Sequence, residues 1–101
     1  MSELHTVNKS PFEKNSCESC LGHATAGSAV LFYEDGVYAV TKGTTVEAKL
    51  KGAQGVKLYA LGPDLKARGI ADDRVIAGVQ VVDYAKFVDL AAEHDKVVAW
   101  V

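Results

Sequence analysis

The sequence has no excess of charge of either sign. Its 101 residues include 11 Lys and Arg against 13 Asp and Glu, a formal net charge of −2 with the three His residues neutral. Without a basic surplus, there is no electrostatic basis for direct binding to nucleic acid or to an anionic membrane. Long apolar runs are also missing, because none approaches the roughly 20 residues that a membrane-spanning helix needs.

Export signals and cofactor motifs are absent as well. The first residues, Met1–His5, lack the basic-then-apolar layout of a signal peptide. The chain contains neither G-x-G-x-x-G nor G-x-x-x-x-G-K-[ST], so nothing in it supports nucleotide binding. We therefore expect a cytoplasmic protein that needs no cofactor.

Cysteine is scarce, and both residues fall in one C-x-x-C pair, Cys17 and Cys20. Because we expect a chain that is not exported, we interpret them as thiols and not as a structural disulfide. A redox dithiol gains its reactivity at a helix N-terminus, whereas the helix here is predicted to begin near Pro11, about two turns earlier. A stand-alone C-x-x-C redox protein is kept as an alternative. His23 would extend the pair toward zinc, but no second pair of ligands follows, so no metal site is expected.

What the sequence does contain is an alternation of apolar and helical patterns. Strands are predicted at Leu4–Val7, Ser28–Tyr33, Val56–Leu61, Val79–Val82 and Lys96–Val101. Helices are predicted from about Pro11 to Gly22 and over Val37–Val40, Thr45–Lys51, Asp64–Arg68 and Tyr84–His94. This order predicts an α/β fold, one small domain over residues 1–101 with a mainly parallel sheet flanked by helices.

Thr45–Lys51 is ambiguous from its pattern alone. Val46, Ala48 and Leu50 alternate with charged residues, as in a strand. Val46 and Leu50 also lie four residues apart, as on one face of a helix. We choose the helix, because parallel strands on either side need a crossover connection between them.

Candidate functional groups lie in the first helix and at the strand ends. Cys17 and Leu21 share a stripe predicted to face the core, which places Cys20 nearer the helix flank. The carboxyl ends of the predicted strands, where open α/β sheets bind ligands, carry Asn8, Glu34, Asp35, Asp64 and Asp83. These acidic residues could form a docking rim for a basic partner, or serve only as helix caps and turn residues.

The last helix and the C-terminal strand carry large apolar residues. Tyr84, Phe87, Val88 and Ala91 fall on one stripe of the helix, opposite its charged residues. Trp100 is an aromatic anchor of the kind enriched at protein interfaces. It either covers the protein's own core or contacts another chain.

Several short stretches along the chain form one ordered set: Leu4-His5 with Ser10-Pro11-Phe12, then Glu34–Val37, then Leu58–Leu61 with Asp64-Leu65 and Ala67–Gly69, and finally Asp83-Tyr84, Phe87-Val88 and Ala99-Trp100. Together they resemble the TusB/DsrH family. The likeness follows the whole chain in order and is greatest to the DsrH branch.

The resemblance implies a DsrE/F/H-like fold and a heterohexameric complex with DsrE/TusD-like and DsrF/TusC-like subunits. Such a complex passes persulfide sulfur to a DsrC/TusE-type carrier, in sulfur oxidation for the DsrH branch or in thiolation of a tRNA wobble uridine for the TusB branch. The main sulfur-carrying Cys is then expected on a partner subunit.

Within this family, DsrH proteins have a Cys in the first helix, and Cys20 matches its position. The resemblance therefore marks Cys20 as a secondary persulfide acceptor and favours the oxidation branch, whereas Cys17 lies outside the pattern. Transfer between a thiolate and a persulfide needs no metal or nucleotide.

Overall fold

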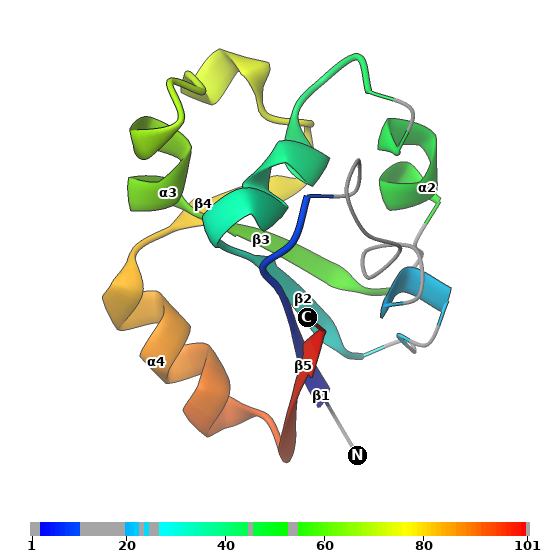
Figure 1. The fold of residues 1–101 in the computed structure, drawn as a ribbon. Coiled ribbons are helices and arrows are strands. Elements are labelled where there is room, and N and C mark those ends of the chain that lie inside the picture. Colours follow the sequence, from blue (N-terminus) through cyan, green and yellow to red (C-terminus); the bar gives the residue numbers. More distant parts are fainter. Residues whose placement is uncertain are drawn as a thin grey trace.

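The computed structural model describes residues 3–10, 20–22, 24, 27–44, 46–52 and 55–100. They form one five-stranded sheet, made of β1 (Glu3–Val7), β2 (Ala29–Phe32), β3 (Lys57–Leu61), β4 (Val79–Val82) and β5 (Lys96–Trp100). The strand order is β4-β3-β2-β1-β5, and every neighbouring pair is parallel (Figure 1). The α/β fold with a parallel sheet is confirmed.

Helical segments connect these strands. They are η1 (Glu34–Val40) and η2 (Asp72–Arg74), which are 3-10 helices, and α2 (Glu47–Lys51), α3 (Gly62–Ala67) and α4 (Tyr84–Glu93), which are α-helices. The ambiguous segment is thus helical, as the crossover argument required. Residues 20–22 are also helical, whereas the rest of the predicted first helix, including Cys17, lies outside the described residues.

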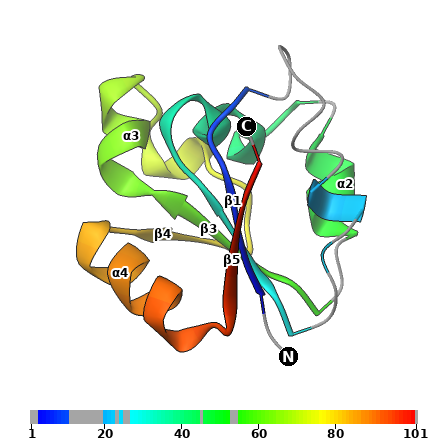
Figure 2. The same ribbon diagram turned by 60° about the horizontal axis from the view of Figure 1, so that its bottom comes forward.

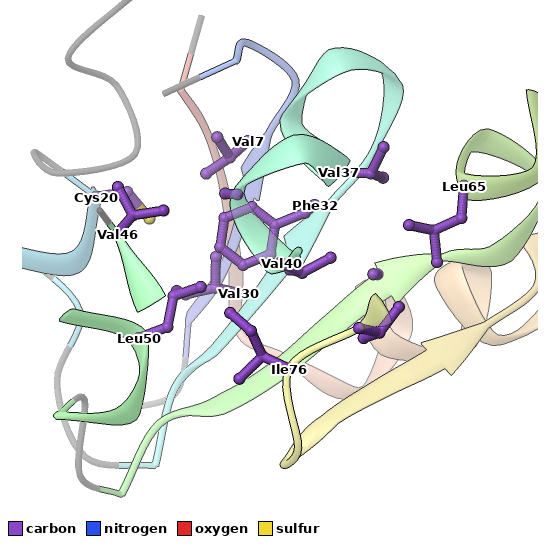
Figure 3. Close-up of a cluster of buried hydrophobic side chains, with 13 residues drawn as sticks. Val7, Cys20, Val30, Phe32, Val37, Val40, Val46, Leu50, Leu65 and Ile76 are labelled. Atoms are coloured by element: carbon purple, nitrogen blue, oxygen red, sulfur yellow. The ribbon is translucent and has the colours of Figure 1, made fainter. Parts of the chain in front are cut away.

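Side chains alternate between the two faces along each strand, and the central strands β1 and β2 are buried on both faces. On one face lies the large core, which contains Cys20, Phe32, Leu50 and Leu65 among thirteen buried residues (Figure 3). On the other face lies the small core of Leu4, Ala29, Leu31, Tyr59, Val82 and Leu90. Successive residues of β2 therefore alternate between the two cores, and all four are fully buried.

Helix α4 covers the small core. The chain steps from β1 through β2 and β3 to β4 and then returns past all of them to β5, on the far side of β1. The crossovers from β1 to β4 move along the sheet in one direction, and the crossover from β4 to β5 moves back. Because crossovers are right-handed, the connection from β4 to β5 must lie on the face of the sheet opposite to the earlier connections. Figure 2 shows α4 and α2 on opposite sides of the sheet. This single long crossover brings the C-terminal strand beside β1.

Only part of the apolar stripe of α4 packs against the sheet. Leu90 is 2% exposed and Phe87 and Ala91 pack beside it, but Tyr84 is 58% and Val88 67% exposed. With 3.6 residues per turn, Tyr84 and Val88 both lie to one side of the sector that faces the sheet. The expected stripe exists, but the sheet covers only part of it.

Gly36 marks a close approach between η1 and the end of β1. Its N–H donates to the Tyr33 carbonyl oxygen, and Glu34 just before it has a left-handed φ of 49°. A Cβ on Gly36 would collide with the carbonyl group of Val7. Because that obstacle is backbone, no side-chain rearrangement can relieve the clash.

We predict that Gly36→Ala destabilises the fold by about 2–3 kcal/mol, through overpacking against the β1 backbone. Urea unfolding followed by circular dichroism measures the change. Gly22→Ala is the matched control, because a Cβ there meets nothing within 4 Å and the residue is helical. Equal effects of the two substitutions would show that the approach of η1 to β1 is not tight.

Candidate functional site

Cys20 lies in the large core, not at the helix flank. Its exposure is 0%, and Figure 3 shows it next to Val46, which precedes α2. The placement nearer the flank was wrong, because helix periodicity alone does not tell how the helix is rotated against the sheet. The Ala24 N–H donates to the Cys20 carbonyl oxygen and continues this helical turn.

The described side chains that pack with Cys20 in the large core are apolar. The buried residues of its cluster include Val7, Val30, Val46 and Leu50. A thiol reacts as the thiolate, and cysteines buried among apolar groups are inert. In this conformation Cys20 is therefore a core residue, and a persulfide donor cannot reach its sulfur.

The acidic residues at the strand ends mostly stabilise local structure. Asp35 Oδ1 accepts from Arg68 Nε and lies 2.9 Å from Arg68 Nη2. Asp64 Oδ2 accepts from the Glu34 N–H at 2.6 Å. Asp83 caps α4, because its Oδ1 accepts from the Lys86 N–H at 2.9 Å. Arg68 was not singled out in the sequence; its place in the turn behind β3 was the only signal.

The loop before α2 is fixed by Glu47. Its Oε1 accepts from the Gly43 N–H at 2.7 Å, and its Oε2 lies 2.9 Å from Lys51 Nζ. The Gly43 hydrogen bond and the Lys51 ammonium lower the pKa of the Glu47 carboxyl. These contacts position Val46, and with it the wall of the core around Cys20.

Trp100, the aromatic anchor of the sequence, packs against the protein's own large core and pairs with the buried His5, a pairing that the sequence did not indicate. Trp100 Nε1 donates to His5 Nδ1 at 3.0 Å, and the ring centroids are 6.1 Å apart. His5 is 2% exposed, and its Nε2 lies 3.4 Å from Glu3 Oε1. The two rings come from opposite ends of the chain, so their contact depends on β5 lying beside β1.

An apolar surface remains along one flank of α4. We define the α4 ledge as Tyr84, Val88 and Val97, with exposures of 58%, 67% and 48%. Val97 is paired with Leu4 of the small core, so it faces the same side of the sheet as α4. Lys86, on the opposite flank of α4, shares a cavity with Val81 of β4. By helix periodicity, Tyr84 and Val88 lie on the flank of α4 opposite Lys86.

Metal and membrane sites have no support in the described part of the chain. Its residues include no group of three or more His, Cys, Asp or Glu side chains placed to hold a metal ion. Among the helices described, none has the length and apolar character needed to cross a bilayer.

Comparison with protein families and curated proteins gives consistent matches. Residues 9–97 match the family model described as DsrH like protein. A protein named TusB from Photorhabdus laumondii is 39% identical over 99 residues, covering 96% of this chain and 99% of that one. A TusB from Escherichia coli O1:K1 / APEC is 34% identical over 97 residues, with the same coverage.

Two solved structures share the fold at lower sequence identity. The ychN protein from E. coli superposes with a TM-score of 0.81 at 19% identity, covering 98% of this chain and 99% of that one. MTH1491 from Methanobacterium thermoautotrophicum gives a TM-score of 0.76 at 18% identity, with 97% of both chains covered. The arrangement of strands and helices is thus shared by distant proteins.

We predict that Cys20 is protected from thiol reagents in the native chain. Cys17→Ser leaves Cys20 as the sole cysteine, and its reaction with Ellman's reagent should be at least ~100-fold slower in buffer than in denaturant, because access requires local opening. The companion variant Cys20→Ser reports Cys17 alone. A Cys20 that reacts equally fast in both solvents would contradict its burial.

Proposed function

The chain belongs to the family of DsrH-like proteins that includes TusB, and from that premise we propose that it is a subunit of a sulfur-relay complex. The complex passes persulfide sulfur to a DsrC/TusE-type carrier in the cytoplasm. Its other subunits are DsrE/TusD-like and DsrF/TusC-like chains, which together with this one form a heterohexamer. The observation that carries the proposal is the family match over residues 9–97, together with a TusB relative that is 39% identical over nearly the full chain.

Two pathways fit this proposal, each with its own support. Cys20 matches the position of the first-helix Cys of DsrH proteins and favours sulfur oxidation. The name TusB carried by the curated relatives favours tRNA wobble-uridine thiolation equally. In both pathways this chain acts on sulfur through its partners, without direct contact with nucleic acid.

The burial of Cys20 supports a division of roles among the subunits. With the sulfur of Cys20 enclosed in the core, the main sulfur-carrying Cys belongs to a partner. We propose Cys20 as a secondary acceptor only when assembly opens the turn at residues 20–24. Its thiolate then attacks the outer sulfur of a partner's persulfide, and the partner's thiolate leaves, so no oxidant is consumed.

The α4 ledge supports assembly. Three large apolar side chains from α4 and β5 remain uncovered by the described residues, and such surfaces mark protein interfaces. We propose that this ledge contacts a sister subunit of the complex.

The persulfide role is tested by loading sulfur onto the assembled complex. We expect mass spectrometry to find one added sulfur atom on Cys20 in the wild-type complex and none in Cys20→Ser, with Cys17→Ser loaded normally. If Cys20 stays unmodified while the partner Cys is loaded, and Cys20→Ser transfers sulfur at the wild-type rate, Cys20 is a packing residue only.

The assembly role is tested with Val88→Lys, made in the chain co-expressed with its two partner subunits. A lysine at the centre of the ledge should weaken association at least about tenfold, because its charge must be buried without a partner. Analytical ultracentrifugation of the purified chains measures this.

The control is Asp89→Lys, which places the same side chain one residue later, at an exposed position on the charged side of α4. Normal assembly of Val88→Lys would remove the ledge from the interface. A wild-type chain that associates with neither partner would contradict the proposed function itself.

A further inference from the structure

His5 is held in one protonation state by Trp100. The Trp100 indole N–H is a donor only, and it points at His5 Nδ1 from 3.0 Å. Nδ1 must therefore be the unprotonated acceptor nitrogen, which puts the ring hydrogen of neutral His5 on Nε2, toward Glu3. A proton on Nδ1 would set two donors against each other and remove the hydrogen bond.

We propose that His5 and Trp100 form a pH-sensitive latch that holds the end of β5 against β1 and releases it when His5 is protonated. Trp100 packs against the large core and is the last residue of β5. Among the described strands, β5 lies at the edge of the sheet and pairs with β1. Its terminal residues can therefore separate from the sheet without disturbing the other four strands.

Protonation of His5 and release of the end of β5 are linked equilibria. In the closed state Nδ1 accepts from Trp100 and His5 is 2% exposed, so both the hydrogen bond and the burial oppose a charge on the ring. In the open state Nδ1 is available to a proton from water. Because the proton binds the open state more tightly, falling pH shifts the population toward it.

The charged and titratable groups around His5 come from several elements. On β1, Glu3 Oε1 lies 3.4 Å from Nε2 and would stabilise the protonated ring. On β5, Lys96 pairs with Glu3 in the strand register and opposes a cation. β2 presents Val30 opposite His5 and Ser28, whose Oγ accepts from the Glu3 N–H. Cys20 is the titratable member of the large core on this face.

The latch can be followed directly, because Trp100 is the only tryptophan in the chain. From about pH 8 to 5, the range in which histidine titrates, we expect its emission to shift to the red. Acrylamide quenching should rise about twofold or more as the indole leaves the core. The far-ultraviolet circular dichroism should stay native over the same range, which separates release of β5 from global unfolding.

Two variants test the assignment. His5→Gln supplies an acceptor oxygen that does not titrate, so Trp100 should stay packed against the large core at every pH in this range. Glu3→Gln removes the carboxylate that favours the cation, so the transition should move to lower pH. The full-length chain is used throughout, and neither variant requires the partner subunits.

Three outcomes would overturn the latch. The first is a Trp100 signal that does not change with pH in the native chain. The second is an unchanged transition in His5→Gln. The third applies if His5→Gln does not fold, and it is a transition in Glu3→Gln at the same pH as in the wild-type chain. This result would show that the titrating proton does not bind His5. None of these results bears on the sulfur-relay proposal, which is tested by assembly and sulfur loading.

Discussion

The structure depends on the burial of β1 between two parallel neighbours and two cores. Leu4, His5, Thr6 and Val7 are all buried, although two of them are polar. Val7 belongs to the large core and Leu4 to the small one. A strand in this position has to satisfy its polar side chains within the protein. The partner of His5 comes from the other end of the chain, and that is possible only because α4 carries the chain across the sheet to β5.

Most of the fold could be predicted from the sequence, because strands covered on both faces are apolar without interruption. Ala29–Phe32 is of this kind, and the crossover rule then decided in favour of the helix at Glu47–Lys51. The orientation of side chains could not be predicted so well. Periodicity gives the width of an apolar stripe but not how much of it the sheet covers. The exposure of Val88 and the burial of Cys20 could therefore not be predicted from the sequence. The contact between His5 and Trp100 requires the strand order, and no local pattern contains it.

The residues that carry the family resemblance are largely explained by packing and hydrogen bonding. Gly36 permits η1 to approach the carbonyl group of Val7, Asp64 of α3 accepts from the first N–H of η1, and Asp35 of η1 holds Arg68 at the end of α3. Asp35 is half exposed in its ion pair with Arg68, so screening by water reduces what that pair contributes to stability. Its value is geometric, since the guanidinium joins η1 to α3. These residues therefore identify the fold, and they give no information about the chemistry of the protein.

This architecture supports the proposed role of the chain as a subunit that acts through partner proteins. A nucleophilic thiol has to be reachable, and the thiol of Cys20 is enclosed by valine and leucine side chains. A large apolar side chain, in contrast, gains most from being covered, and Tyr84 and Val88 remain outside. The chain thus places its sulfur where it stabilises the fold and its apolar flank where another protein can bind. That distribution suits a protein that shapes a complex more than one that catalyses alone.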